Sequence, residues 1–233
     1  MTPPVDVLPY AASRHAAPPS RLGQRYAADV FLPEPGNTVV CHLDMVDPTH
    51  VAVLAARNAM RALNGTQSFL FTPVQSIHMT LFEGVIETRR TPDAWPKDMS
   101  QDTPVSVVTE ALLPRLAAFQ PLEPFSVRVV GLRPTGLMLE GATAKDATVM
   151  RAWRDALTEP FGYRHTAHDD YRFHMTFAYP VQWIEDKHVP LWEAAFAEIL
   201  SDLQRDAPVI PLRPPAFCRF NDMTRFEELM VLR

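Results

Sequence analysis

Two short motifs in this sequence carry side chains that can do chemistry together. They are His78–Leu81 (HMTL) and His174–Phe177 (HMTF), one in each half of the 233-residue chain. Each begins with histidine, continues with methionine and threonine, and ends on an apolar residue. A single His-x-Thr triplet is uninformative, but two copies that share the central methionine indicate a duplicated site.

Each motif lies in a strand-like run. Because successive side chains of a strand point to opposite faces, His78 and Thr80 share one face, and His174 and Thr176 share a face of the second strand. The opposite face of each strand is heavily apolar. An unpaired buried polar group costs about 1–3 kcal/mol. We therefore expect both motifs to face one water-filled groove.

Two imidazoles and two hydroxyls in one groove suit phosphoester cleavage. The unperturbed pKa of histidine is about 6.5, so one ring can be neutral and the other protonated near neutral pH. One ring then takes a proton from water while the other gives a proton to the leaving oxygen, and each role is worth about 10²–10⁴-fold. The threonine hydroxyls can donate to non-bridging phosphate oxygens. This scheme requires no metal ion and no cofactor.

With these motifs the chain resembles the two-histidine (2H) phosphoesterase superfamily, whose signature is a pair of H-x-(T/S)-x elements with a hydrophobic last position. The resemblance covers residues 36–233. It implies an α+β, bilobal, pseudo-twofold fold with antiparallel sheets lining a central cleft and helices outside. It also implies metal-independent hydrolysis of cyclic phosphates on nucleotides, RNA ends or ADP-ribose derivatives. The implied catalytic residues are His78, His174, Thr80 and Thr176.

Three more residues are candidates for substrate binding. Arg172 shares the groove face of its strand and either holds a phosphate bidentately or pairs with an aspartate of the preceding loop, 165–170. Phe82 lies on the motif face of the first strand by simple alternation and can stack on a base. His42 either lines the groove or is buried against a backbone carbonyl.

Glu83 and Tyr179 depart from the family pattern. Many RNA-acting members have a basic residue five positions after each motif histidine, where this chain has these two. The departure disfavours a long RNA substrate more than it disfavours the chemistry. Strand alternation also places Tyr179 on the apolar side, so we predict that it belongs to the core.

Other interpretations of the motifs stay open. The two histidines could be satisfied core residues, or they could bind a metal ion, although His42 and His50 lack a diagnostic spacing as further ligands. The same fold could be a non-catalytic module that binds a nucleotide or an RNA end. The His- and Asp-rich loop 165–170 is expected to be solvated. A serine hydrolase is disfavoured because the chain has no G-x-S-x-G motif.

Charge and composition limit the classes of partner that the chain can have. The net charge of −5 argues against an extended nucleic-acid surface, so the expected partner is a small nucleotide or an RNA end. The 8 glycines form neither G-x-G-x-x-G nor a complete phosphate loop. No apolar run approaches the roughly 20 residues that span a bilayer, and no signal peptide is evident. With buried, unpaired thiols expected at Cys41 and Cys218, we predict a cytoplasmic protein of undetermined oligomeric state.

The elements that must position the motifs alternate in two similar halves. Helices are expected over 48–63, 105–119, 144–157 and 191–203, with Pro114 breaking or kinking the second. The expected strands are 38–43, 77–82, 125–132, 137–139, 171–179, 209–212, 216–220 and 227–232.

The chain divides into two parts. Residues 1–35 are rich in proline and should form an extended arm that either docks on the body or covers a site. Residues 36–233 should form one bilobal catalytic domain, because no flexible linker interrupts them. The lobes are expected at roughly 36–135 and 136–233, and exchange of strands between them is left open.

Overall fold

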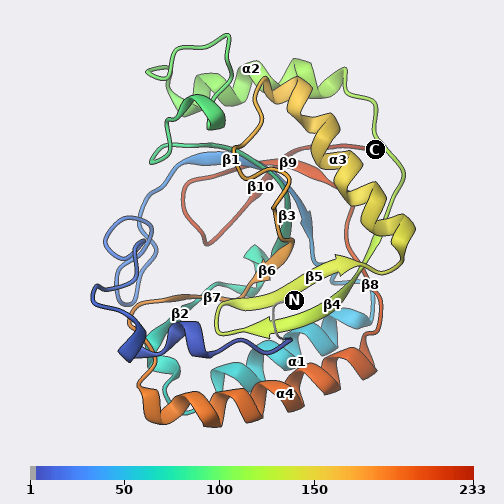
Figure 1. Cartoon of the computed structure of the whole chain (residues 1–233). Coiled ribbons are helices and arrows are strands. Elements are labelled where there is room, and N and C mark those ends of the chain that lie inside the picture. Colours follow the sequence, from blue (N-terminus) through green and yellow to red (C-terminus); the bar gives the residue numbers. More distant parts are fainter. Residues whose placement is uncertain (1–3) are drawn as a thin grey trace.

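A curled antiparallel sheet forms the centre of the computed structural model, which describes residues 4–233 (Figure 1). Its strand order is β10-β9-β1-β3-β6-β5-β4-β8. These strands are β1 (Gly36–His42), β3 (His78–Ile86), β4 (Ser126–Arg133), β5 (Gly136–Gly141), β6 (His174–Thr176), β8 (Ile210–Pro211), β9 (Ala216–Phe220) and β10 (Glu227–Val231). A second sheet pairs β2 (Phe69–Phe71) with β7 (Ala178–Pro180).

Four helices cover the outside of the sheet in the described residues. Helices α1 (Thr49–Arg61) and α4 (Val189–Asp206) pack together, and α4 contacts β4. Helices α2 (Val105–Ala117) and α3 (Ala144–Phe161) pack together beside β1 and β3. Figure 1 shows the first pair below β4 and β5 and the second pair above β1 and β3. The α+β class, with antiparallel strands inside and helices outside, is confirmed.

Segments from both halves of the chain build each side of the sheet. The C-terminal strands β9 and β10 continue the sheet beyond β1, which comes from the N-terminal half. Helix α1 of the first half packs on α4 of the second half. Within residues 4–233, no helix combines the length and the apolar character that a membrane span needs.

Strand β2 was not among the expected strands, and two further elements differ from the sequence prediction. The expected strand 171–179 is split into β6 and β7, because the chain leaves the large sheet after Thr176 and pairs next with β2. The backbone N–H of Phe177 donates instead to the carbonyl of Thr135, which joins β4 to β5. Helix α2 runs through Pro114 without a break, although this proline cannot donate to the carbonyl of Glu110.

The proline-rich arm lies along the body of the protein. Its described part, residues 4–35, forms isolated bridges from Val5 to Leu132 and from Ala11 to Ile184. Val7, Ala11 and Tyr26 of the arm are fully buried. Residues 1–3 of the arm lie outside the described residues. The arm therefore belongs to the packed structure.

A substitution at Gly136 tests how tightly the sheet packs against the second motif. The φ of Gly136 is 139°, and a Cβ atom here would lie 2.1 Å from the backbone oxygen of Met175. We expect Gly136→Ala to lower the free energy of unfolding by at least about 2 kcal/mol. Gly23→Ala is the control, because Gly23 also has a positive φ but has no atom within 4 Å of the added carbon. Thermal unfolding of both variants measures the difference, and equal losses would contradict it.

Candidate active site

The two motif strands are neighbours in the sheet. β3 pairs with β6 in antiparallel fashion, and the central methionines Met79 and Met175 lie directly opposite each other. Both methionine side chains are fully buried on the helix-covered face. Because strand side chains alternate, the histidine and threonine of both motifs point to the other face. This register produces the predicted arrangement, in which the four polar motif residues share one face of the sheet.

His78, Thr80, His174 and Thr176 line a single cleft. The antiparallel register brings His78 towards Thr176 and His174 towards Thr80. The two histidines are therefore diagonal neighbours, a relation that separates positions on paired strands by about 7–8 Å. Two rings at that spacing can flank one phosphorus atom from opposite sides.

Both imidazole rings are oriented by the same hydrogen bond. Nδ1 of His78 lies 2.7 Å from the carbonyl oxygen of Ser76, and Nδ1 of His174 lies 2.9 Å from the carbonyl oxygen of Arg172. Since a carbonyl only accepts, each Nδ1 carries the hydrogen and donates it. This assignment leaves Nε2 of each ring as the atom that exchanges a proton with a bound molecule.

The surroundings of the two rings differ. His78 is packed between the ring of Phe226, at a centroid distance of 4.1 Å, and the ring of His42, at 6.2 Å. Burial lowers the pKa of His78 to about 3, and charge on His42 or His174 acts in the same direction. His174 is exposed and has Tyr171 beside it. In the ligand-free cleft, His78 is thus neutral at physiological pH.

The hydroxyls of Thr80 and Thr176 are available to a ligand. Both threonines are half-buried in the cleft. The carbonyl of Thr80 accepts a hydrogen bond from the Tyr171 hydroxyl, but within residues 4–233 neither threonine side chain donates to another group. Two unengaged hydroxyls beside two histidines can therefore donate to the oxygens of a phosphate.

Phe82 does not line the cleft, in contrast to the sequence prediction. A β-bulge lies in β3, where Val39 and Val40 of β1 pair with Phe82 and Thr80 and leave Leu81 unpaired. The extra residue reverses the alternation beyond Thr80. Phe82 is therefore fully buried and packs against Phe161.

The same break in alternation places the next residue, Glu83, in the cleft. Arg89 pairs with Glu83 at 3.1 Å. Burial alone would raise the pKa of this carboxyl, but the nearby Arg89 and His165 outweigh burial and lower the pKa. Glu83 is consequently an ionised and partnered acid in the cleft.

Tyr179 is also placed differently from the prediction. The split between β6 and β7 interrupts strand alternation at Phe177, so Tyr179 faces the cleft, whereas Phe177 is fully buried. Both motifs are thus followed by an irregularity that turns the fifth residue after the histidine into the cleft. Neither irregularity has a signal in the sequence.

His42 and Arg172 stand at the margin of the cleft. His42 is buried opposite His78, and its Nδ1 lies 3.2 Å from a carboxylate oxygen of Glu228. Burial lowers the pKa of His42, although Glu228 opposes the effect. Arg172 is exposed and lines an adjoining hollow with His174 and Arg133. Among residues 4–233, Arg172 makes no ion pair, so the alternative of a pair with the preceding aspartates is not observed.

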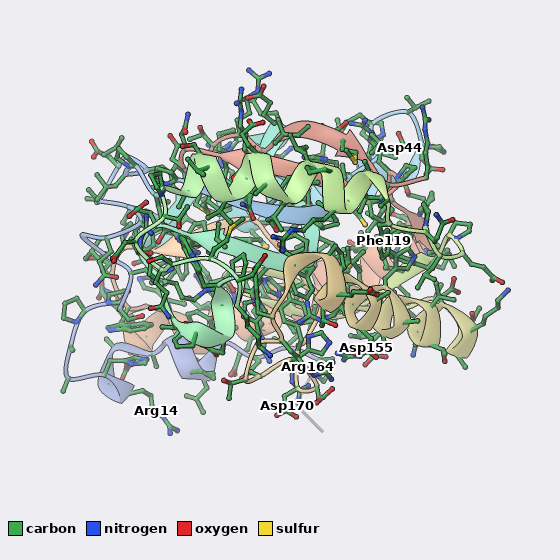
Figure 2. The ribbon with its side chains drawn as sticks, turned by 90° about the horizontal axis from the view of Figure 1, so that it is seen from above. Arg14, Asp44, Phe119, Asp155, Arg164 and Asp170 are labelled. Atoms are coloured by element: carbon green, nitrogen blue, oxygen red, sulfur yellow. The ribbon has the colours of Figure 1, made fainter. Side chains whose placement is uncertain are left out.

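One cluster of potential metal ligands occurs in the described residues, and it lies away from the cleft. Asp155, His168 and Asp169 bring one ligand atom each within 4.8 Å of one another. The guanidinium group of Arg164 pairs with both aspartates, and Figure 2 shows Asp155 and Arg164 close together near the end of α3. Arg164 thus provides the positive charge beside these two aspartates, where a metal ion would otherwise be expected.

Sequence reasoning did not identify Arg25 as a site residue. Arg25 comes from the arm, far from either motif in sequence, yet its side chain lines the cleft beside Tyr179. The arm itself carries no motif, and only the folded chain shows this contact. The cleft thus receives residues from the arm, from both motif strands and from the C-terminal segment 220–226.

Known proteins resemble this chain in sequence and in structure. Residues 25–138 match the family model described as "2H-phosphodiest: Domain of unknown function (DUF1868)". No curated protein matches the chain. A similar solved structure is the crystal structure of the conserved protein of unknown function ATU0111 from Agrobacterium tumefaciens str. C58. The two share 45% sequence identity over 98% of this chain and 99% of the other, with a TM-score of 0.96.

The lowered pKa of the half-buried His78 predicts a dependence of stability on pH. Its pKa is about 3 in the folded chain and about 6.5 in the unfolded chain, so the unfolded state binds more protons between these values. Stability is therefore complete above pH 6.5 and falls as the pH drops towards 3, by at most about 1.4 kcal/mol per pH unit from this residue.

His78→Asn tests this dependence, because the amide can still donate to Ser76 but cannot titrate. We expect the variant to lose less stability than the wild type between pH 6.5 and 4.5, measured by urea unfolding. Parallel pH profiles for the two proteins would contradict a lowered pKa of His78 in the folded chain.

Proposed function

Because the chain belongs to the 2H phosphoesterase superfamily, which points to a phosphodiesterase-type hydrolase, we propose that it hydrolyses a cyclic phosphate without a metal ion. The proposed substrate is a 2′,3′-cyclic nucleotide or an RNA end with this group. The observation that carries the proposal is the register of β3 and β6, which brings His78 and His174 to one cleft with two free threonine hydroxyls.

His78 and His174 have different roles in this mechanism. His78 is neutral and accepts a proton at Nε2 from the attacking water, whose oxygen forms a new bond to phosphorus. His174 enters the reaction protonated and donates a proton to the ribose oxygen as its bond to phosphorus breaks. Water supplies one proton to His78 and the product takes one from His174, so the net proton balance is closed. The pair resets when a proton passes from His78 to His174 through solvent.

Thr80 and Thr176 stabilise the charge that develops on the non-bridging oxygens, since their hydroxyls lie beside the two rings. Arg172, in the hollow that adjoins His174, adds a positive charge near the reacting phosphate. His42 positions the ring of His78 from the neighbouring strand and does not enter the cleft lining.

An apolar wall of Phe220, Met223 and Phe226 supports a nucleotide as the substrate. These side chains line the cleft next to the histidines, and Phe226 contacts the ring of His78. Aromatic side chains stack on bases with little dependence on the base. The net charge of −5 favours a small ligand over a long nucleic acid.

The residues Cys41 and Cys218 support a reducing location such as the cytoplasm. Both are buried free thiols, and burial raises the pKa of each. Unpaired thiols of this kind are typical of proteins in reducing compartments. We include a cytoplasmic location in the proposal on this ground.

Single substitutions of the two histidines test the chemistry. We expect His78→Ala and His174→Ala each to lower kcat for adenosine 2′,3′-cyclic phosphate by at least about 100-fold, because each removes one proton transfer. His50→Ala is a matched control, since His50 lies at the start of α1 outside the cleft. Circular dichroism verifies the fold. Full activity in either cleft variant would eliminate the mechanism.

The threonines and the absence of a metal requirement give a second test. We expect Thr80→Val and Thr176→Val each to lower kcat by about 10- to 100-fold with KM nearly unchanged, because the lost donor acts on charge in the transition state. EDTA should leave the wild-type rate unchanged. Loss of activity in EDTA and its recovery with a divalent ion would contradict the metal-independent mechanism.

A non-catalytic binding module is the second candidate function, and the exposed, solvent-accessible His174 is compatible with it. Calorimetry with the cyclic nucleotide, run beside a sensitive hydrolysis assay, separates the two functions. Hydrolysis by the wild type supports the enzyme. Binding without product at any pH between 5 and 9 supports the module.

A further inference from the structure

The arm supplies the cleft with a fixed positive charge. Arg25 lines the cleft, and its guanidinium carbon lies 5.9 Å from the ring centre of Tyr179, which also lines the cleft. Tyr26 and Phe31 of the arm pack on the same ring. These contacts bring the arm to the cleft at Tyr179.

A buried carboxylate holds Arg25 in place. Glu34, fully buried, accepts from Nε of Arg25, from Arg21 and from the hydroxyl of Thr88. Its backbone N–H donates to the carbonyl of Asn221, next to the apolar wall. A charge-assisted bond of this kind is strong when it is shielded from water. Glu34 therefore fixes the arm to the body and sets the position of the Arg25 side chain.

Glu34 leaves part of Arg25 for a ligand. An arginine has five N–H donors, and Glu34 uses the one at Nε. The Tyr179 hydroxyl is a second hydrogen-bond partner of the Arg25 guanidinium, and the donors that remain are on the terminal Nη groups. The other acid of the cleft, Glu83, is paired with Arg89. Arg25 is thus a cation that can take an anion bidentately through its Nη groups.

The apolar wall and Arg25 line the same cleft as the two histidines. Phe226 contacts the ring of His78, and Tyr179 packs on the same cluster as Phe226. Tyr179 follows Thr176 by three residues of the chain, which span at most about 10 Å when extended. A molecule in the cleft can therefore contact the two histidines, an apolar surface and a cation.

We propose that Arg25 binds a second anionic group of the substrate, so that the preferred substrate is a cyclic nucleotide with another phosphate at the far end of its nucleoside. The inference rests on the proposed function and adds to it a specificity residue from the arm. The arm is then a wall of the site as well as a packed segment.

Two substrates that differ by one phosphate test the proposal. They are adenosine 2′,3′-cyclic phosphate and the same nucleotide with a 5′-phosphate. We expect the wild type to hydrolyse the 5′-phosphorylated substrate with the higher kcat/KM. Arg25→Gln should lower kcat/KM for that substrate by about 10- to 100-fold, mainly through KM, and should change the other substrate little.

Arg21→Gln is the matched control, because Arg21 also binds Glu34 but does not line the cleft. It should keep the preference for the 5′-phosphate. Arg25→Gln leaves Glu34 with one fewer partner, so a second variant, Arg25→Gln with Glu34→Gln, removes both charges together. A loss of preference in this double variant, with its thermal unfolding unchanged, supports the role of Arg25 in binding.

The outcomes separate this inference from the proposed function. The role of Arg25 is overturned if the wild type hydrolyses both substrates without a preference, or if Arg25→Gln keeps the preference. Either result leaves the proposed hydrolase activity standing. If neither substrate is hydrolysed, the proposed function fails, and calorimetry then decides the inference. Tighter binding of the 5′-phosphorylated nucleotide to the wild type than to Arg25→Gln supports it, and equal binding overturns it.

Discussion

The pairing of Met79 with Met175 determines the geometry of the whole cleft. A slip of one residue between β3 and β6 would turn the histidine and threonine of one motif into the helix-covered face and its methionine into the cleft. The two methionines are fully buried against the helices, so the hydrophobic effect opposes such a slip. Packing on one face of the sheet thereby fixes the chemistry on the other. The hydrogen bonds from each Nδ1 to a backbone carbonyl then orient rings that this register has already placed.

The two copies of the motif share a backbone arrangement but have different surroundings. His78 lies under Phe226, and burial keeps it neutral, whereas His174 is open to solvent. General acid–base catalysis needs one ring in each protonation state, and unequal surroundings determine which of the two rings is the neutral one. The C-terminal segment that carries Phe226 comes from outside both motifs, so the asymmetry of the histidines originates in the way the chain end folds back over the first motif.

Much of the fold and the centre of the site could be predicted from the sequence, because both depend on local patterns. Alternation identified the faces of the motif strands, and the repeated motif related His78 to His174. Phe82 and Tyr179 were placed wrongly, since the unpaired Leu81 and the break at Phe177 change the alternation without any mark in the sequence. Arg25 was missed for another reason: its position depends on long-range contacts through the buried Glu34. Local patterns carry no information on such contacts.

The bulge in β3 and the break after β6 have one consequence in common. Each turns the fifth residue after the motif histidine into the cleft, and the two residues have opposite effects on an anion. Glu83 is an ionised acid that Arg89 neutralises in part, whereas Tyr179 lies beside the guanidinium group of Arg25. The electrostatic potential along the cleft is therefore uneven. Coulomb attraction then favours one orientation of an anionic substrate over the reverse orientation. In the proposed mechanism, a fixed orientation of the substrate would decide which ester oxygen faces His174, and hence which bond to phosphorus is broken.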